Sequence, residues 1–114
     1  MLQILHNPRC GKSRDCVLFT TETETPFEII NYIENPLTVD ELKVLVKKLR
    51  VKPIEIVRQK EPIWIEKYKG RKLNNGQILK ALANYPVLMQ RPIVIDGDKA
   101  VIGREIDKLE AFLK

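Results

Sequence analysis

The sequence predicts an α/β fold in which a small mixed sheet is flanked by helices. A strand, a helix and a second strand open the chain, an antiparallel hairpin and a helix close it, and several helices lie between. This order is the connectivity of a thioredoxin-like sandwich with a helical insertion between its βαβ and ββα halves. The 114 residues suffice for one domain. We expect the halves at about residues 1–37 and 87–114 and the insertion at about 38–86.

The opening βαβ unit is predicted from two short apolar segments. Leu2–Leu5 is a run of strand type that ends in a loop containing proline and glycine. The pattern from Lys12 to about Thr20 favours a helix, with Val17 and Leu18 as its expected core contacts. After a polar connection, the aromatic and β-branched residues of Phe27–Tyr32 predict the second strand.

The insertion is predicted to be helical. Thr38 and Glu41 have the spacing of a capping box, and apolar residues follow at intervals of three and four, so a helix is expected to about Arg50. Two prolines divide the next segment into short helical pieces. A further helix is expected from the cap Asn74 to Asn84.

The closing ββα unit has the clearest local signals. Ile93–Ile95 is strongly of strand type, and the Asp-Gly pair within Asp96–Lys99 is typical of a hairpin turn. Ala100–Ile102 is therefore the expected partner strand. The last helix is expected to open at Gly103 and to run to about Leu113.

Composition and charge argue against several classes of protein. The net charge of +5 is concentrated in residues 41–80, which hold 12 basic and 4 acidic residues. We interpret this segment as a solvated lysine-rich face, because it has few aromatic residues on which bases could stack. Two cysteines and one histidine favour neither a disulfide framework nor a metal site. No apolar run is as long as a membrane span, and no signal peptide is recognisable. We expect a cytoplasmic monomer with no tightly bound cofactor, no membrane partner and no nucleic-acid partner.

Cys10 is the candidate nucleophile. It lies where the first loop turns into a helix, so free backbone N–H groups and the helix dipole favour a thiolate there. Four neighbouring side chains are positively charged or can become so: His6, Arg9, Lys12 and Arg14. A reactive thiol is therefore favoured over a structural cysteine.

The residues after Cys10 offer it no partner thiol. Ser13 stands where a dithiol oxidoreductase has its resolving cysteine, so another thiol must complete the reaction. Cys16 is six residues further on, roughly 9 Å along a helix, too far for a disulfide without unwinding, and is expected in the core. It also occupies the position of the arginine that a cysteine-based phosphatase loop requires.

The segment His6–Arg14, which reads His-Asn-Pro-Arg-Cys-Gly-Lys-Ser-Arg, resembles the active-site signature of the glutaredoxin-coupled arsenate reductase (ArsC) family. The resemblance extends over essentially the whole chain. The other stretches that fit the family are Tyr32–Pro36, Ile56–Lys60, Tyr85–Leu88, Gln90–Val94 and Ile102–Arg104.

The resemblance implies a role for individual residues. Cys10 corresponds to the cysteine that attacks arsenate, and His6 to a histidine that favours its thiolate. The residues implied in substrate binding are the three arginines around the oxyanion and their neighbours, namely Arg58, Arg91, Arg104, the cis-proline Pro92, Asn7 and Ser13. Arg9 and Lys12 are additional cations at positions that vary or are neutral in some members. Guanidinium groups suit this substrate, because their paired N–H donors match two oxygens of a tetrahedral oxyanion.

The implied activity is reduction of arsenate to arsenite, with glutathione as co-substrate and glutaredoxin as partner. Three alternatives stay open. The chain could be a glutathione-dependent thiol reductase with another substrate. It could be an Spx-like regulator that binds RNA polymerase, although Ser13 replaces the second cysteine of that regulator's redox switch. It could also be a monothiol glutaredoxin that holds an iron–sulfur cluster.

Overall fold

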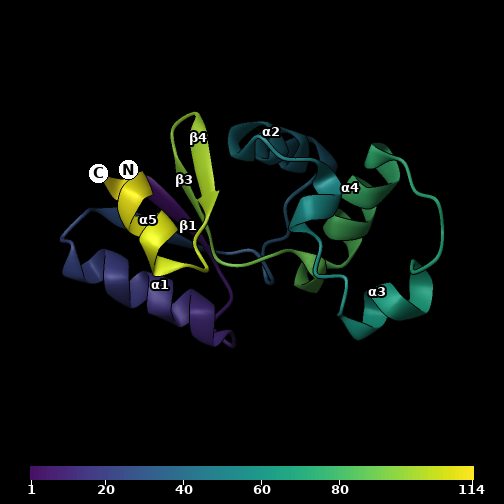
Figure 1. Ribbon diagram of the computed structural model, residues 1–114, viewed down its shortest axis with the longest axis horizontal. Helices are drawn as coiled ribbons and strands as arrows, with labels where there is room; N and C mark the ends of the chain where they lie inside the picture. Colours follow the sequence, from purple (N-terminus) through teal and green to yellow (C-terminus); the bar gives the residue numbers. More distant parts are fainter. The chain divides into compact units, whose positions relative to one another are not determined.

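The computed structural model describes all of residues 1–114, and the chain forms two compact units (Figure 1). The first unit combines Met1–Asn35 with Arg91–Lys114, and the second is Pro36–Gln90. The helical insertion expected at about 38–86 falls within the second unit. No helix of the chain is both long enough and apolar enough to cross a membrane.

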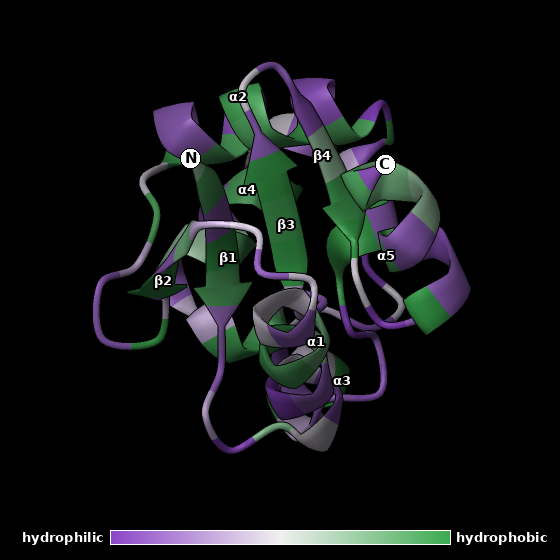
Figure 2. Cartoon of the chain, turned by 90° about the vertical axis from the view of Figure 1, so that its left-hand side faces the viewer, coloured by the Kyte–Doolittle hydropathy of each residue, from purple (hydrophilic) through white to green (hydrophobic).

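A four-stranded mixed sheet with the order β2-β1-β3-β4 forms the centre of the first unit. The strands β1 (Leu2–His6) and β2 (Phe27–Asn31) are parallel, and β3 (Ile93–Asp96) pairs antiparallel with both β1 and β4 (Lys99–Ile102). The two central strands, β1 and β3, are mostly coloured as hydrophobic in Figure 2. With its flanking helices, this sheet confirms the predicted thioredoxin-like α/β fold.

Two helices, α1 (Gly11–Glu22) and α5 (Ile106–Leu113), pack against the same face of this sheet. Burial of apolar side chains between them stabilises the unit. The buried residues of this cluster are Leu2, Ile4, Cys16, Val94 and Leu109. Val17 packs at its margin, as predicted.

The prediction that Leu18 is a core residue was wrong, because its side chain is 62% exposed. The buried face of α1 consists instead of Ser13, Cys16 and Thr20, at helical intervals of three and four. Thr20 is tolerated there because its hydroxyl donates to the carbonyl of Cys16 (2.8 Å). Small side chains, and not that of Leu18, therefore form the buried face of α1.

The last helix begins three residues later than predicted. Gly103 and Arg104 precede α5, and Glu105 is its N-cap. The Gly103 N–H donates to the carbonyl of Pro92 (2.8 Å), and Arg104 Nη1 donates to the carbonyl of Arg91 (3.1 Å). These bonds attach Gly103 and Arg104 to the segment before β3, so the helix begins beyond them.

The second unit is helical. It contains α2 (Val39–Leu49), η1 (Pro53–Ile56), α3 (Pro62–Lys67), α4 (Asn75–Asn84) and η2 (Pro86–Leu88). Both predicted caps are confirmed: Thr38 Oγ1 accepts the Glu41 N–H (3.1 Å), and Asn74 Oδ1 accepts the Gln77 N–H (2.8 Å). The buried faces of α2 and α4 pack against each other.

Candidate active site

Cys10 is the N-cap of α1 and directly follows the loop that leaves β1. Its N–H donates to the carbonyl of Asn7 (3.0 Å), and its own carbonyl accepts the N–H of Arg14 (3.0 Å). The Arg9 N–H donates to Oδ1 of the buried Asn7 side chain (3.0 Å). These bonds fix the backbone of Cys10 and leave its free thiol partly exposed at the end of the helix.

Helix N–H groups and a guanidinium lower the pKa of the Cys10 thiol. Partial burial alone raises this pKa, because removal from water disfavours the thiolate. The N–H of Ser13, the charge and hydrogen bond of Arg91, and the N–H of Lys12 oppose burial and bring the pKa below its ordinary value. Both N–H groups belong to the first turn of α1, where no earlier carbonyl is available to accept them. This is an environment typical of a nucleophilic thiolate.

Cys16 has the opposite environment. Its side chain is fully buried, and burial raises the pKa of its thiol to about 11 despite a hydrogen bond with Thr20. The prediction that Cys16 is a core residue is confirmed. Of the two thiols, Cys10 is therefore the one that its surroundings favour as a thiolate.

Ser13 connects the loop to His6. Its buried Oγ accepts the N–H of Asn7 (3.0 Å) and lies 2.7 Å from Nδ1 of His6. Burial and the charge of Arg14 both lower the pKa of His6, which favours a neutral imidazole at neutral pH. With its proton on Nε2, that imidazole accepts the Ser13 O–H at Nδ1. The imidazole therefore contacts the helix start through Ser13, while the positive charge that lowers the pKa of Cys10 is that of Arg91.

Arg91 and Pro92 lie immediately before β3, joined by a cis peptide bond. The residues that follow β4 hold both of their carbonyls, one through the Gly103 N–H and the other through Arg104 Nη1. The guanidinium of Arg91 interacts with Cys10. The hairpin therefore brings two arginines that are distant in sequence to the same region of the first unit.

Tyr32, the first residue of the family-like stretch Tyr32–Pro36, also belongs to this site. It follows β2 directly, and its side chain is 1% exposed. Burial raises the pKa of its hydroxyl to about 12, and the charge of Cys10 also raises it, whereas the charge of Arg91 and the side-chain N–H donors of Arg91 and Asn7 lower it. The phenol thus lies among the groups that surround the candidate nucleophile.

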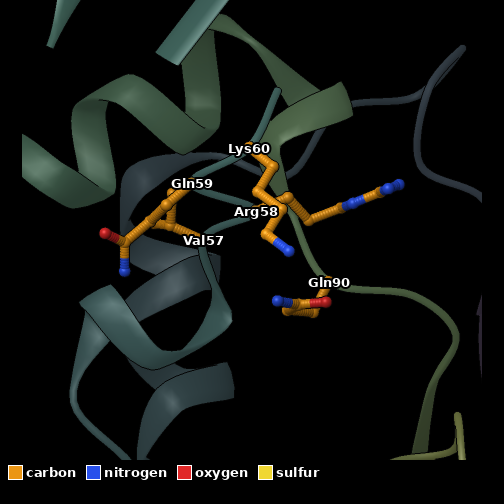
Figure 3. A pocket seen from close by; sticks show the side chains of 5 residues that line it. All are labelled: Val57, Arg58, Gln59, Lys60 and Gln90. Carbon is orange, nitrogen blue, oxygen red and sulfur yellow. The ribbon is translucent and has the colours of Figure 1, made fainter. Parts of the chain in front are cut away.

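Arg58 belongs to the second unit. Its N–H donates to the carbonyl of Leu88 (2.7 Å), and its Nη1 lies 3.4 Å from Oε1 of Glu61. In Figure 3 the Lys60 ammonium and the Gln90 amide point toward one another, and the Arg58 guanidinium extends in another direction. These residues line a pocket of about 310 Å³, whose full lining is Val57, Arg58, Gln59, Lys60 and Gln90.

Of the residues predicted for the site, all except Arg58 lie in the first unit. There they are His6, Asn7, Cys10, Ser13, Arg91, Pro92 and Arg104. Arg9 and Lys12 are exposed beside Cys10. Nowhere in the chain do three or more His, Cys, Asp or Glu side chains gather in a group that could hold a metal ion.

The model of the ArsC family matches residues 5–112, nearly the whole chain. The protein belongs to the ArsC family. An arsenate reductase of Neisseria meningitidis is 34% identical, and the match covers 98% of this chain and 97% of that protein. The solved structure of an arsenate reductase from Vibrio cholerae has 30% identity and a TM-score of 0.91, and covers 96% of this chain and 95% of that one.

The chain is also similar to a protein with a different described role. A global transcriptional regulator of Bacillus cereus, Spx 1, is 25% identical over 99% of this chain and 87% of its own length. ArsC membership therefore establishes the fold and the relationship to arsenate reductases, and the chemistry of this chain has to be argued from its own residues.

Proposed function

We propose that this ArsC-family protein reduces arsenate to arsenite, with Cys10 as the nucleophile, glutathione as co-substrate and glutaredoxin as protein partner. The observation that carries the proposal is the environment of the Cys10 thiol. It is partly exposed at the N-terminus of α1, beside the guanidinium of Arg91, with its pKa lowered. The arsenate reductases among the relatives support arsenate as the substrate.

Positive charge makes the first step feasible. Arsenate and a thiolate are both anions, so they repel each other unless cations lie between or around them. Arg104, after β4, is hydrogen-bonded to Arg91, before β3, and both guanidinium groups supply N–H donors for the oxygens. In the proposal Arg58 is the third arginine of the substrate site. Exposed Arg9 and Lys12 add to the attraction.

The reaction proceeds in three exchanges. The Cys10 thiolate attacks arsenic, a sulfur–arsenic bond forms, and one arsenate oxygen leaves as water after protonation. A glutathione thiolate then attacks the Cys10 sulfur, and arsenic leaves with the bonding electron pair, reduced from the pentavalent to the trivalent state. A glutaredoxin thiolate attacks the glutathione sulfur of the resulting mixed disulfide and frees Cys10.

The remaining predicted residues position this chemistry. Ser13 contributes its N–H to the thiolate and joins the N–H of Asn7 to the imidazole of His6 through its hydroxyl. Asn7 holds the loop through both its side chain and its carbonyl. The carbonyl of Pro92 accepts the N–H of Gly103, the residue after β4, and this bond fixes the backbone beside Arg91.

Regulation of the Spx type is the second candidate, since an Spx protein is among the relatives. Such a regulator uses a second cysteine three positions after the first, and this chain has Ser13 there. Ser13 is fully buried and hydrogen-bonded to His6 and Asn7. A redox switch at this position is therefore disfavoured.

The test is a coupled assay with purified protein, glutathione, glutaredoxin, glutathione reductase and NADPH. NADPH oxidation is expected to depend on arsenate. Cys10→Ser should abolish it, and Cys16→Ser should retain most of it, because Cys16 is buried with a raised pKa. This pair makes the same chemical change inside and outside the proposed site.

The outcomes separate the candidates. Turnover without arsenate dependence, with Cys10 still alkylated rapidly near neutral pH, would support a thiol reductase that acts on another substrate. Retained activity in Cys10→Ser would contradict the mechanism. Stoichiometric recovery of RNA polymerase subunits from a lysate would support the regulator instead.

A further inference from the structure

Tyr32 enters the active-site region because of the register of the sheet. The parallel strands β1 and β2 pair with His6 opposite Asn31. The carboxyl ends of parallel strands meet at one edge of a sheet, where open α/β folds bind their ligands. Asn7 and Tyr32, the residues directly after these two strands, therefore leave the sheet at the same edge, close to Cys10.

The hydroxyl of Tyr32 is buried, and no acceptor for its O–H lies within hydrogen-bond geometry. Buried polar groups are normally paired, so this one needs an explanation. Its polar neighbours, Arg91 and Asn7, face it with N–H donors, which lowers the pKa of the phenol, and so neither accepts its O–H. The Cys10 thiol affects the hydroxyl through charge alone.

An acceptor for this O–H comes from solvent or from a bound ligand, because the chain supplies none. A phenol whose pKa is raised to about 12 stays protonated wherever the thiolate of Cys10 can act. Its O–H is therefore a permanent donor beside a cationic guanidinium and a nucleophilic sulfur. An anion with several oxygens fits all three groups, since each oxygen can accept a hydrogen bond.

We propose that the Tyr32 O–H donates a hydrogen bond to an oxygen of the tetrahedral oxyanion that binds against Cys10. Arg91 neutralises the charge of the anion, and Tyr32 fixes the direction of one of its oxygens. The inference rests on the proposed function only for the identity of that oxyanion, arsenate. It makes Tyr32 a substrate-binding residue that acts on the ligand and not on the thiol.

The experiment measures how well arsenate, without glutathione, protects Cys10 from alkylation by iodoacetamide. Three proteins are compared: the unmodified chain, Tyr32→Phe, and Tyr85→Phe as the matched control. Tyr85 is a partly buried tyrosine of the second unit whose ring contacts Tyr68. Both substitutions remove one oxygen and keep the ring. Thermal unfolding of each variant confirms that the fold is retained.

Tyr32→Phe should raise the arsenate concentration needed for half-protection about tenfold, the loss expected for one hydrogen bond to a charged group. The alkylation rate without arsenate should stay within about twofold of the unmodified chain, since the hydroxyl does not bond to the thiol. Tyr85→Phe should change neither quantity.

The inference would be overturned if arsenate protected Tyr32→Phe as well as it protects the unmodified chain, or if it did not protect the unmodified chain at all. It would also be overturned if the alkylation rate of Tyr32→Phe without arsenate changed by as large a factor as the arsenate concentration needed for half-protection. The coupled assay reports separately on the proposed function. Protection that weakens in Tyr32→Phe, in a protein with no arsenate-dependent turnover, would support the oxyanion contact and contradict the reductase.

Discussion

Nδ1 of His6 lies 2.7 Å from Oγ of Ser13, and the same Oγ accepts the N–H of Asn7. One hydroxyl thereby connects the end of β1, the active-site loop and the first turn of α1. The thiol of Cys10 takes a hydrogen bond from the N–H of the same serine. Ser13 thus contributes to the site twice, by its backbone at the sulfur and by its side chain at the loop.

The sole histidine of the chain gives a direct test of this contact. Burial and the charge of Arg14 lower the pKa of His6, so its single imidazole signal in an NMR titration should titrate below the ordinary value of 6.5. Arg14→Gln removes one of the two causes and should move the titration upward. An unchanged midpoint in this variant would contradict the assigned role of Arg14.

The lowered pKa of His6 also affects the stability of the folded protein. Below pH 6.5 the unfolded chain takes up the imidazole proton more readily than the folded chain, because the folded pKa is lower. The contribution of His6 is therefore fully present above pH 6.5 and decreases as the pH falls through that value. Urea denaturation across this range should show a decrease that is smaller in His6→Gln.

Removal of the Ser13 hydroxyl should destabilise the protein. Ser13→Ala leaves the N–H of Asn7 without its acceptor in a buried position, which costs about 1–3 kcal/mol of unfolding free energy. Thr21→Ala is the control on the same helix, since its exposed hydroxyl donates to the carbonyl of Val17 (2.8 Å). The control should lose less than about 0.5 kcal/mol in urea denaturation. Equal losses of unfolding free energy in the two variants would contradict the stabilising role of the buried Ser13–Asn7 hydrogen bond.

Arg91→Ala should slow alkylation of Cys10 at pH 7 by roughly threefold to tenfold, because the pKa of the thiol rises when the guanidinium is lost. At a pH above the pKa of both proteins the rates should converge. The arsenate requirement should rise by more than the alkylation rate falls, since the same guanidinium binds substrate in the proposal. Equal effects would assign Arg91 to thiol activation alone.

A substitution at Gly103 tests how closely this residue packs against Cys16 and Pro92. A Cβ on this residue would lie 3.3 Å from Sγ of Cys16 and 3.5 Å from Cγ of Pro92. Gly103→Ala should therefore destabilise the protein by about 1–3 kcal/mol. The combination with Cys16→Ala, which makes room, should cost less than the sum of the two single changes. Strict additivity in urea denaturation would argue against this contact.

The sequence predicts the site best where its determinants are local. Cys10 lies between a recognisable strand and a helix, so the thiol and its helix N–H groups could be anticipated from adjacent residues. The roles of Arg91 and Pro92 were implied by the family resemblance, and the β-branched run and the Asp-Gly turn placed both residues directly before a strand. The fold class was predicted from the same kind of signal, namely strand-type runs separated by turn residues.

Two predictions were wrong, the start of α5 and the burial of Leu18. The start of α5 was predicted too early because the bond from Gly103 to the carbonyl of Pro92 is invisible to a periodic pattern. Leu18 was misplaced because the buried face of α1 is marked by a serine, a cysteine and a threonine. Tyr32 could have been found from its position directly after a strand parallel to β1, had the register been considered.

The most direct test of the central claim is intact-mass analysis of a single turnover without glutaredoxin. Protein is mixed with glutathione, with and without arsenate, and the modified residue is located after digestion. The account predicts a glutathione mixed disulfide on Cys10 that forms only when arsenate is present, with Cys16 unmodified. A mixed disulfide on Cys16, or one that forms on Cys10 equally well without arsenate, would contradict the account.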